Sequence, residues 1–212
     1  MKPPERRGAL ERARLYLVAP GEFPADLLES VVAAGVDVVQ LRMKDAEAAE
    51  ILEIGERFRA VCERAGVPFV VNDRPDVALA LDADGVHLGQ DDLPPSVARR
   101  IVGPDVLIGR STHSREDIER ARAEHGEGVA DYIAVGPLYE TPTKPGRPAV
   151  GPDLLAYAAR RVPFPWFAIG GINATNVAGV VATGASRIVV VRAITEAADP
   201  IGAVEALRRA LG

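Results

Sequence analysis

Short runs of β-branched and other apolar residues alternate along this chain with longer segments in which apolar residues recur every three or four positions. The short runs predict strands, and the longer segments predict amphipathic helices. Most of the predicted strands are apolar at successive positions, which is typical of strands buried on both faces of a parallel sheet. The predicted strands are residues 14–19, 36–42, 69–72, 85–88, 106–109, 132–135, 166–169 and 187–191.

A helical pattern follows each predicted strand. Several of these segments begin with Asp, Ser or Asn, which favour helix N-caps, and several end in Gly, which favours helix C-caps. Eight strand–helix units in a row predict an α/β fold, a (β/α)8 TIM barrel that forms a single domain over residues 1–212. An open doubly wound sheet is the alternative, but it seldom contains eight such regular units. The predicted helices are residues 25–35, 45–66, 74–83, 93–103, 114–126, 151–161, 173–184 and 199–212.

Composition limits the classes of partner. The 212 residues include 48% hydrophobic and 26% charged residues, as expected for one globular domain, and the net charge of −5 argues against a nucleic acid held by bulk charge. The single cysteine, Cys62, falls in a predicted helix, where we interpret it as a packing residue. Neither a signal-peptide pattern nor a membrane-spanning apolar run is evident, so we expect a cytoplasmic protein without a membrane partner. Homo-oligomer formation is left open.

The segment QLRMK gives the first indication of chemistry. It ends an apolar strand, and the two-residue period of an extended chain places Gln40, Arg42 and Lys44 on one face. Two cations at a buried strand end are costly unless an anion lies against them. The segment therefore predicts an anionic ligand.

Polar residues also follow the other predicted strands. In a (β/α)8 barrel the carboxyl ends of all strands meet at one rim, where the active site lies. These residues are therefore expected to converge. After strands three to eight they are Asn72–Arg74, Gln90–Asp92, Arg110–His113, Gly136 with Thr141, Thr143 and Lys144, Gly170–Ile172, and Arg192.

The residue types suggest two anion sites on this rim. Asp73 and Asp92 suit Mg²⁺, which takes one or two protein carboxylates and completes its coordination shell with water and substrate phosphate. Arg42, Lys44 and Lys144 suit phosphate oxygens. A glycine pair at residues 170–171 has no Cβ and leaves backbone N–H groups open to a second phosphate. We expect pyrophosphate with Mg²⁺ near strands two to four, and a metal-free phosphate near strands seven and eight.

Each group also has a purely structural interpretation. The QLRMK cations could form a solvated strand end, Asp73 and Asp92 could be helix caps, and the glycine pair could be a tight turn without a ligand. Ser111 and Thr112 could be turn residues, His113 a structural histidine, and the TPTK run with Arg147 a solvated loop. The coincidence of all these groups on one rim favours a site.

Six segments in order resemble the thiamine phosphate synthase family: QLRMK, VND, DGVHLGQDD, GRSTHS, DYIAVGPLYETPTK and FAIGGI. The resemblance runs from about residue 14 to residue 210. It implies a (β/α)8 barrel and a transferase that joins 4-amino-2-methyl-5-hydroxymethylpyrimidine diphosphate to 4-methyl-5-(2-phosphooxyethyl)thiazole. The products would be thiamine phosphate and pyrophosphate, formed by a Mg²⁺-assisted dissociative displacement that needs no protein nucleophile.

The resemblance also implies roles for individual residues. Asp73 and Asp92 would bind Mg²⁺, and Lys144, Ser111 and Arg42 would act on the reacting groups. The pyrimidine diphosphate would be held by Gln40, Arg42, Lys44, Asn72, Ser111 and Lys144. The thiazole phosphate would be held by Thr141, Thr143, Gly171, Val191 and Arg192, with loop 140–151 closing over the site.

The chain departs from the family pattern in two places. Many relatives have Ser where this chain has Arg192, so the phosphate contact falls either to this side chain or to the backbone of Val191 and Arg192. The first strand usually ends in a polar residue such as Asp, whereas here it runs into Ala19, Pro20 and Gly21. Any ligand contact from that position is in doubt.

Three alternative functions are left open. A thiazole tautomerase of the same fold would use His113 for proton transfer, but it needs no diphosphate site. A non-catalytic regulatory relative could keep the barrel, and a phosphate-sugar isomerase would rest on the fold alone. The set of Arg42, Lys44, Asp73 and Asp92 favours the synthase over all three.

Overall fold

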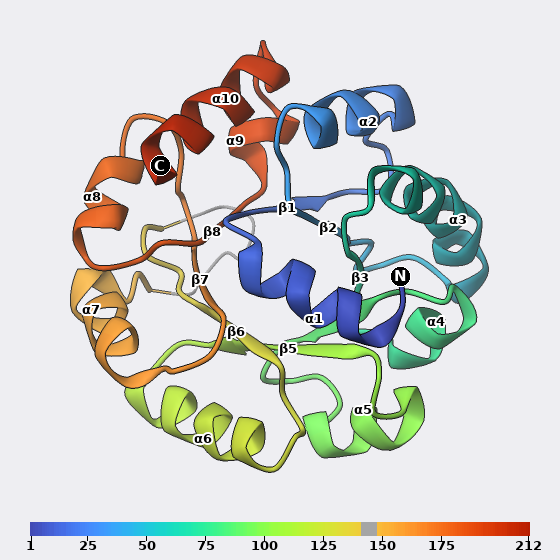
Figure 1. Cartoon of the computed structure of the whole chain (residues 1–212), viewed down its shortest axis with the longest axis horizontal. Coiled ribbons are helices and arrows are strands. Elements are labelled where there is room, and N and C mark those ends of the chain that lie inside the picture. Colours follow the sequence, from blue (N-terminus) through green and yellow to red (C-terminus); the bar gives the residue numbers. More distant parts are fainter. Residues whose placement is uncertain (141–147) are drawn as a thin grey trace.

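Eight parallel strands form a closed barrel in the computed structural model, which describes residues 1–140 and 148–212 (Figure 1). The strands follow one another around the barrel in chain order, and β8 pairs with β1 to close it. The predicted (β/α)8 fold in a single domain is thus confirmed. The strands are β1 (Leu15–Ala19), β2 (Val38–Leu41), β3 (Phe69–Asn72), β4 (Gly85–Leu88), β5 (Leu107–Thr112), β6 (Tyr132–Val135), β7 (Trp166–Ile169) and β8 (Ile188–Val190).

Helices surround the barrel, and the helical periodicity places their apolar faces against the strands. The helices of the ring are α2 (Ala25–Ala33), α3 (Ala48–Ala65), α4 (Pro75–Ala80), α5 (Pro95–Val102), α6 (Arg115–Gly126), α7 (Gly151–Arg161), α8 (Val177–Ala182) and α10 (Pro200–Leu211). The sequence pattern missed two helices, α1 (Pro3–Arg12) and the single-turn α9 (Arg192–Thr195).

Several predicted helix boundaries are correct for the expected reason. The Ser114 hydroxyl accepts the Asp117 N–H at the start of α6, and the Asp199 carboxylate accepts the Gly202 N–H at the start of α10. At the end of α3, Gly66 adopts φ 68°, a left-handed conformation that glycine reaches without steric cost.

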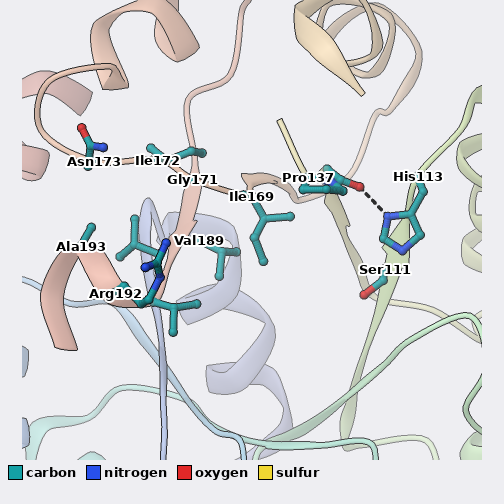
Figure 2. A pocket seen from close by; sticks show the side chains of 14 residues that line it. Ser111, His113, Pro137, Ile169, Gly171, Ile172, Asn173, Val189, Arg192 and Ala193 are labelled. Atoms are coloured by element: carbon teal, nitrogen blue, oxygen red, sulfur yellow. Dashed lines mark hydrogen bonds between the residues drawn. The ribbon is translucent and has the colours of Figure 1, made fainter. Parts of the chain in front are cut away.

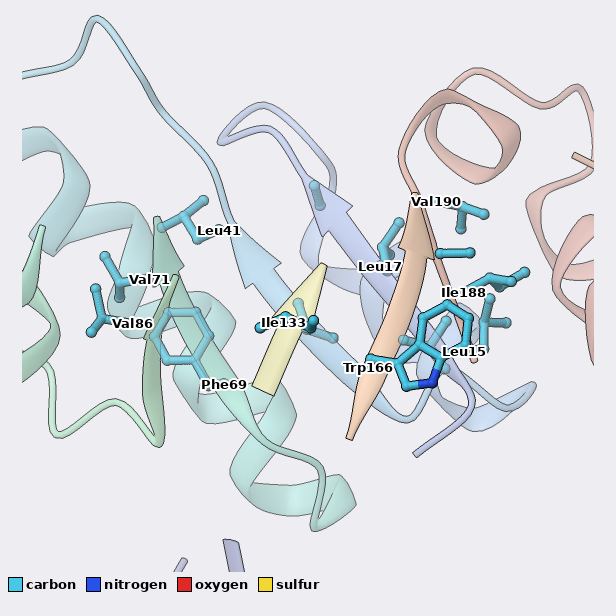
Figure 3. Close-up of a cluster of buried hydrophobic side chains, with 14 of the residues drawn as sticks. Leu15, Leu17, Leu41, Phe69, Val71, Val86, Ile133, Trp166, Ile188 and Val190 are labelled. Atoms are coloured by element: carbon cyan, nitrogen blue, oxygen red, sulfur yellow. The ribbon is translucent and has the colours of Figure 1, made fainter. Parts of the chain in front are cut away.

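The side-chain period of two along each strand divides the apolar core into two parts. One set fills the layer between strands and helices, including Leu17, Phe69, Ile133 and Trp166 (Figure 3). The other fills the inside of the barrel, including Val38, Leu107 and Phe167. Inward-facing side chains near the ends of different strands therefore meet in the centre of the barrel, and this geometry positions the site.

Strand β5 is longer than the sequence pattern predicts. The pattern ends at residue 109 because polar residues follow, but pairing with β6 continues through Ser111 opposite Ala134 and Thr112 opposite Val135. The Thr112 hydroxyl donates to the Ala134 carbonyl at 3.1 Å and so satisfies a buried polar group. The rim residue Ser111 therefore stands on a rigid strand rather than on a turn.

Helix α1 lies across the amino-terminal end of the barrel (Figure 1). Its Leu10 is 3% exposed and packs in the inner cluster, which is capped at this end. The Arg6 Nε donates to the Asp84 carboxylate at 2.7 Å and ties α1 to the start of β4. Helix α1 therefore covers the barrel interior at the end opposite to the carboxyl-terminal rim.

Within residues 1–140 and 148–212, none of the helices combines the length and apolar character needed to cross a bilayer.

Truncation of the α1 side chain that enters the barrel should be costly. We expect Leu10→Ala to lower the free energy of unfolding by about 2–4 kcal/mol, because it removes buried methyl groups and leaves a cavity. Chemical denaturation of the purified variant measures this loss. The exposed neighbour variant Glu11→Ala is the control and should differ from the wild type by less than about 0.5 kcal/mol. Equal stability of both variants would mean that α1 does not seal the inner core.

Candidate active site

Two cavities that share lining residues open at the carboxyl-terminal rim. The larger of these two, of about 300 Å³, lies beside β7 and β8 and is here called the β7–β8 pocket. It is lined by Ser111, His113, Gly136, Pro137, Ile169, Gly170, Gly171, Ile172, Asn173, Val189, Val190, Val191, Arg192 and Ala193 (Figure 2). The smaller, of about 50 Å³, lies in the barrel mouth and is called the central pocket. Its lining is Tyr16, Val18, Gln40, Arg42, Asn72, His87, Ser111, Ala134, Ile169, Val189 and Val191.

The central pocket brings together residues from strands two, three and five that the sequence predicts to converge. Gln40, Arg42, Asn72 and Ser111 all line it. Gln40 is 3% exposed, and its amide nitrogen has no hydrogen-bond partner within the described part of the chain. A buried donor without an acceptor costs free energy, which a ligand acceptor would recover.

Two carboxylates face one another beside this pocket. The Asp73 and Asp92 carboxyl groups lie close enough to share a hydrogen bond when one of them is protonated. Burial and the neighbouring Asp92 raise the pKa of Asp73 to about 7, although the charge of Arg42 and a hydrogen bond from Asn72 act in the opposite direction. Like charges pressed together in this way fit a cation, which would take the place of the shared proton.

Loop contacts after β4 fix the position of Asp92. Its Oδ2 atom accepts the Gly89 N–H at 2.7 Å. The Arg110 guanidinium donates to the Gly89 carbonyl and to the Gln90 side chain, both at 3.3 Å. These contacts hold the start of the loop against β5 and so orient the carboxylate.

The structure excludes the interpretation of both aspartates as helix caps. The N-cap of α4 is Arg74 and the N-cap of α5 is Pro94, and neither helix receives a side-chain cap. Asp73 has φ 61°, in the left-handed region that a non-glycine residue adopts at a cost. Its side chain interacts with Asp92.

Backbone groups dominate the outer wall of the β7–β8 pocket. Gly171 has φ 67°, and a Cβ there would lie 2.8 Å from the Tyr139 Cβ, so the tight turn requires glycine. In residues 1–140 and 148–212, the N–H groups of Gly171, Arg192 and Ala193 have no hydrogen-bond acceptor. Backbone donors that converge after strands seven and eight are typical of phosphate sites in this fold.

Arg192 lies at the start of α9, in the wall of this pocket, with its side chain 43% exposed. The guanidinium lies 3.7 Å from the Glu196 carboxylate, an exposed pair. Lys44 is exposed and lines neither cavity.

The loop between β6 and α7 leaves and rejoins the barrel beside the β7–β8 pocket. The N–H groups of Leu138 and Tyr139 donate to the carbonyls of Ile169 and Gly170, and the Val150 N–H donates to the Pro137 carbonyl. Three predicted site residues, Thr141, Thr143 and Lys144, lie outside the described residues, as does Arg147.

His113 lies at the edge of the β7–β8 pocket, where its Nδ1 atom donates to the Gly136 carbonyl (Figure 2). Three polar residues of the barrel interior were missed by the sequence analysis: His87, Tyr16 and Tyr132. A signal was present for His87, because it stands at an inward position two residues after Gly85 in the apolar run GVHL.

Comparisons with known proteins bear on this arrangement. Residues 15–194 match a family model described as thiamine monophosphate synthase. The thiamine-phosphate synthase of Thermus thermophilus is 53% identical over 205 residues, which cover 93% of this chain and 97% of the relative. The thiamine-phosphate synthase of Acidothermus cellulolyticus is 51% identical over 200 residues, 92% of each chain. A solved thiamine phosphate pyrophosphorylase from Pyrococcus furiosus has TM-score 0.85 and 34% identity, over 95% of this chain and 96% of that one.

The closed barrel, with polar residues gathered in pockets at its carboxyl-terminal rim, is that of a (β/α)8 enzyme. More specifically, the chain belongs to the thiamine monophosphate synthase family, and it is a transferase.

The acidic pair predicts a pH-dependent gain in stability on substitution. Because the pKa of Asp73 is about 7 in the folded protein and about 3.8 ordinarily, the folded state binds the proton more tightly. Its stability therefore falls as pH rises from about 4 to about 7, and the full cost remains above pH 7. Without metal at pH 8, Asp73→Asn should raise the free energy of unfolding by about 1–2 kcal/mol after solvent screening is allowed for.

Urea denaturation in EDTA at pH 8 and pH 5 measures this gain, which should shrink at pH 5. The exposed Asp105→Asn variant is the matched control and should show no gain at either pH. An equal gain of Asp73→Asn at both pH values would contradict the carboxylate pairing.

Proposed function

We propose that this protein joins 4-amino-2-methyl-5-hydroxymethylpyrimidine diphosphate to 4-methyl-5-(2-phosphooxyethyl)thiazole and releases pyrophosphate and thiamine phosphate. The observation that carries the proposal is the pair of adjoining pockets with different chemistry, in a chain of this family. The central pocket adjoins charged side chains, and the β7–β8 pocket offers backbone donors. Among the described residues, Ser111 is the one polar side chain that lines both.

The central pocket suits the pyrimidine diphosphate. Gln40 would donate its unpartnered amide to a ring nitrogen, which satisfies a buried group that is otherwise costly. Arg42 and Asn72 would contact the diphosphate, with Arg42 able to hold two oxygens at once. Lys44 and Lys144 are assigned to the same diphosphate on sequence resemblance.

Asp73 and Asp92 would hold Mg²⁺. Their two carboxylates are the number this ion typically takes from a protein, and the remaining positions go to water and phosphate. In the described part of the chain no group of three or more His, Cys, Asp or Glu side chains surrounds a metal position. When bound, the ion supplies positive charge to the leaving pyrophosphate.

The β7–β8 pocket suits the thiazole phosphate. The N–H groups of Gly171, Arg192 and Ala193 would donate to its oxygens. The assignment of Thr141 and Thr143 to the same phosphate rests on the sequence resemblance.

The arrangement fits a dissociative displacement. The C–O bond to pyrophosphate breaks first, and the ring amino group stabilises the resulting methylene cation; the thiazole nitrogen then attacks that carbon. The apolar side chains Ile169, Val189 and Val191 lie between the two pockets and would exclude water from the cation. The task of the protein is to bind the leaving group and align the two rings.

The proposal predicts metal-dependent product formation. Purified protein with both substrates and Mg²⁺ should form thiamine phosphate, measured by oxidation to its fluorescent thiochrome derivative, and excess EDTA should abolish the signal. Asp92→Asn should reduce turnover by at least about 100-fold, because the developing charge loses its counter-ion. Absence of product under every condition would overturn the proposal and favour the tautomerase alternative with His113. Product that is insensitive to EDTA would overturn the metal role alone.

The phosphate assignment predicts that the backbone N–H groups contribute more to binding of the thiazole phosphate than the Arg192 side chain does. Gly171→Ala should raise KM for the thiazole phosphate about 10–100-fold, because the added Cβ displaces a donor to a charged group. Arg192→Ala should raise it less than about threefold, as expected for an exposed and already paired cation. Initial-rate kinetics with each substrate varied in turn distinguish the two, and KM for the pyrimidine diphosphate should stay constant. A larger effect of Arg192→Ala would assign the phosphate to its side chain.

A further inference from the structure

Below the central pocket, four buried side chains form a continuous chain of hydrogen bonds. The Tyr16 and Tyr132 hydroxyl oxygens are 2.9 Å apart, and the Tyr132 hydroxyl lies 3.2 Å from His87 Nδ1. His87 Nε2 lies 3.0 Å from the Ser111 Oγ. The chain crosses the barrel interior through inward positions of β1, β6, β4 and β5, and it ends at the hydroxyl shared by both pockets.

A glycine at residue 109 makes room for this chain. A Cβ at Gly109 would lie 2.2 Å from the Tyr132 ring and 2.5 Å from His87 Nδ1, far inside van der Waals contact. The backbone of β5 is otherwise regular there, with Gly109 paired to both His87 and Tyr132 in the strand registers. The missing side chain therefore serves the contact between Tyr132 and His87 rather than a turn.

The direction of the hydrogen bonds follows from which ends have acceptors. Tyr16 is 1% exposed, and its hydroxyl has no partner other than Tyr132 within residues 1–140 and 148–212. It must therefore donate to Tyr132, since the opposite direction would leave its proton buried without an acceptor. Tyr132 then donates to His87 Nδ1, and His87 Nε2–H donates to Ser111.

Both tyrosines are suited to this donor role. Burial, together with the neighbouring Tyr132, raises the pKa of Tyr16 well above its ordinary value, and burial likewise raises the pKa of Tyr132. They remain protonated donors under all ordinary conditions. The chain thus fixes one tautomer of the His87 ring, with hydrogen on Nε2.

We propose that His87 is a positioning residue, which accepts from Tyr132 and donates to the Ser111 oxygen so that the Ser111 proton points into the active site. The inference rests on the proposed function, in which Ser111 contacts the reacting diphosphate or pyrimidine. A serine hydroxyl without this contact rotates freely among three staggered positions, so only part of the population would donate to the ligand. Orientation before binding removes that loss.

Two amide variants separate positioning from mere packing. Glutamine carries its amide about as far from the backbone as His87 Nε2, and asparagine about as far as Nδ1. His87→Gln should therefore keep a donor to Ser111 and retain kcat within about fivefold of the wild type. His87→Asn should lose that donor and lower kcat about 10–100-fold, the range expected for Ser111→Ala, with KM for both substrates changed less than about threefold.

A double variant tests whether the two residues act as a unit. His87→Asn added to Ser111→Ala should cost no more than about twofold beyond Ser111→Ala alone. Thr112→Val is the matched control, because it removes a buried hydrogen bond from the same strand on its outer face. Its kcat should stay within about twofold of the wild type even if its stability falls.

A spectroscopic measurement tests the tautomer directly. The chain has three histidines, so ¹⁵N NMR of the imidazole rings is readily assigned with single variants. We expect the His87 ring in the Nε2–H form, and a shift toward the other tautomer in Tyr132→Phe, with kcat about fivefold lower.

The outcomes separate this inference from the proposed function. If the wild type forms no thiamine phosphate, the proposed function fails. If the wild type is active but the double variant loses kcat by the product of the two single-variant factors, the positioning role is overturned. It is also overturned if His87→Gln is as slow as His87→Asn. An Nδ1–H tautomer in the active wild type would overturn it as well.

Discussion

Closure of the eight-stranded sheet is the constraint on which the rest of this molecule depends. Once β8 pairs with β1, every second side chain must enter the narrow interior of the barrel. Apolar residues fill that interior from the α1 end, and polar residues occupy the inward positions near the other rim. The same alternation that builds the core therefore delivers Gln40, Asn72 and Ser111 to one pocket without any loop having to fold over them.

The two halves of the rim present different kinds of polar group. Around strands two to four the charges are carried by side chains, with Arg42 close enough to lower the pKa of Asp73 against the effects of burial and Asp92. Around strands seven and eight the donors belong to the backbone, and Gly171 keeps them accessible. The charge of the first half changes with pH because the pKa of Asp73 is about 7, whereas the second half has fixed backbone donors.

The fold was predictable because periodicity reports burial, and burial on both faces of eight strands leaves few architectures. Strand boundaries were less predictable where polar residues face inward, as at Ser111 and Thr112, because a polar residue ends an apolar pattern whether it meets solvent or a pocket. Helix α1 was missed because half of its residues are charged, and among its described side chains Leu10 alone is buried.

The candidate site was predictable from position rather than from residue type. Arg42, Asp73 and Asp92 follow strands, and in this fold all strand ends converge. The same rule cannot identify a residue inside a strand, so His87 and its tyrosine partners were passed over. It also cannot decide between a side-chain and a backbone contact, as at Arg192, whose backbone lines the pocket while its side chain lies near Glu196.

The empty space at Gly109 has a consequence for how this protein changes over evolutionary time. Alanine at this position would strike the Tyr132 ring, so it is acceptable only in a chain whose residue 132 has already become smaller. That earlier change would remove the tyrosine hydroxyl that contacts His87 Nδ1. Substitutions at these three positions can therefore accumulate only in certain orders, and each intermediate must survive with a weakened interior. These three positions lie on strands that are separated in sequence, yet the substitutions accepted at each one depend on the residues at the other two.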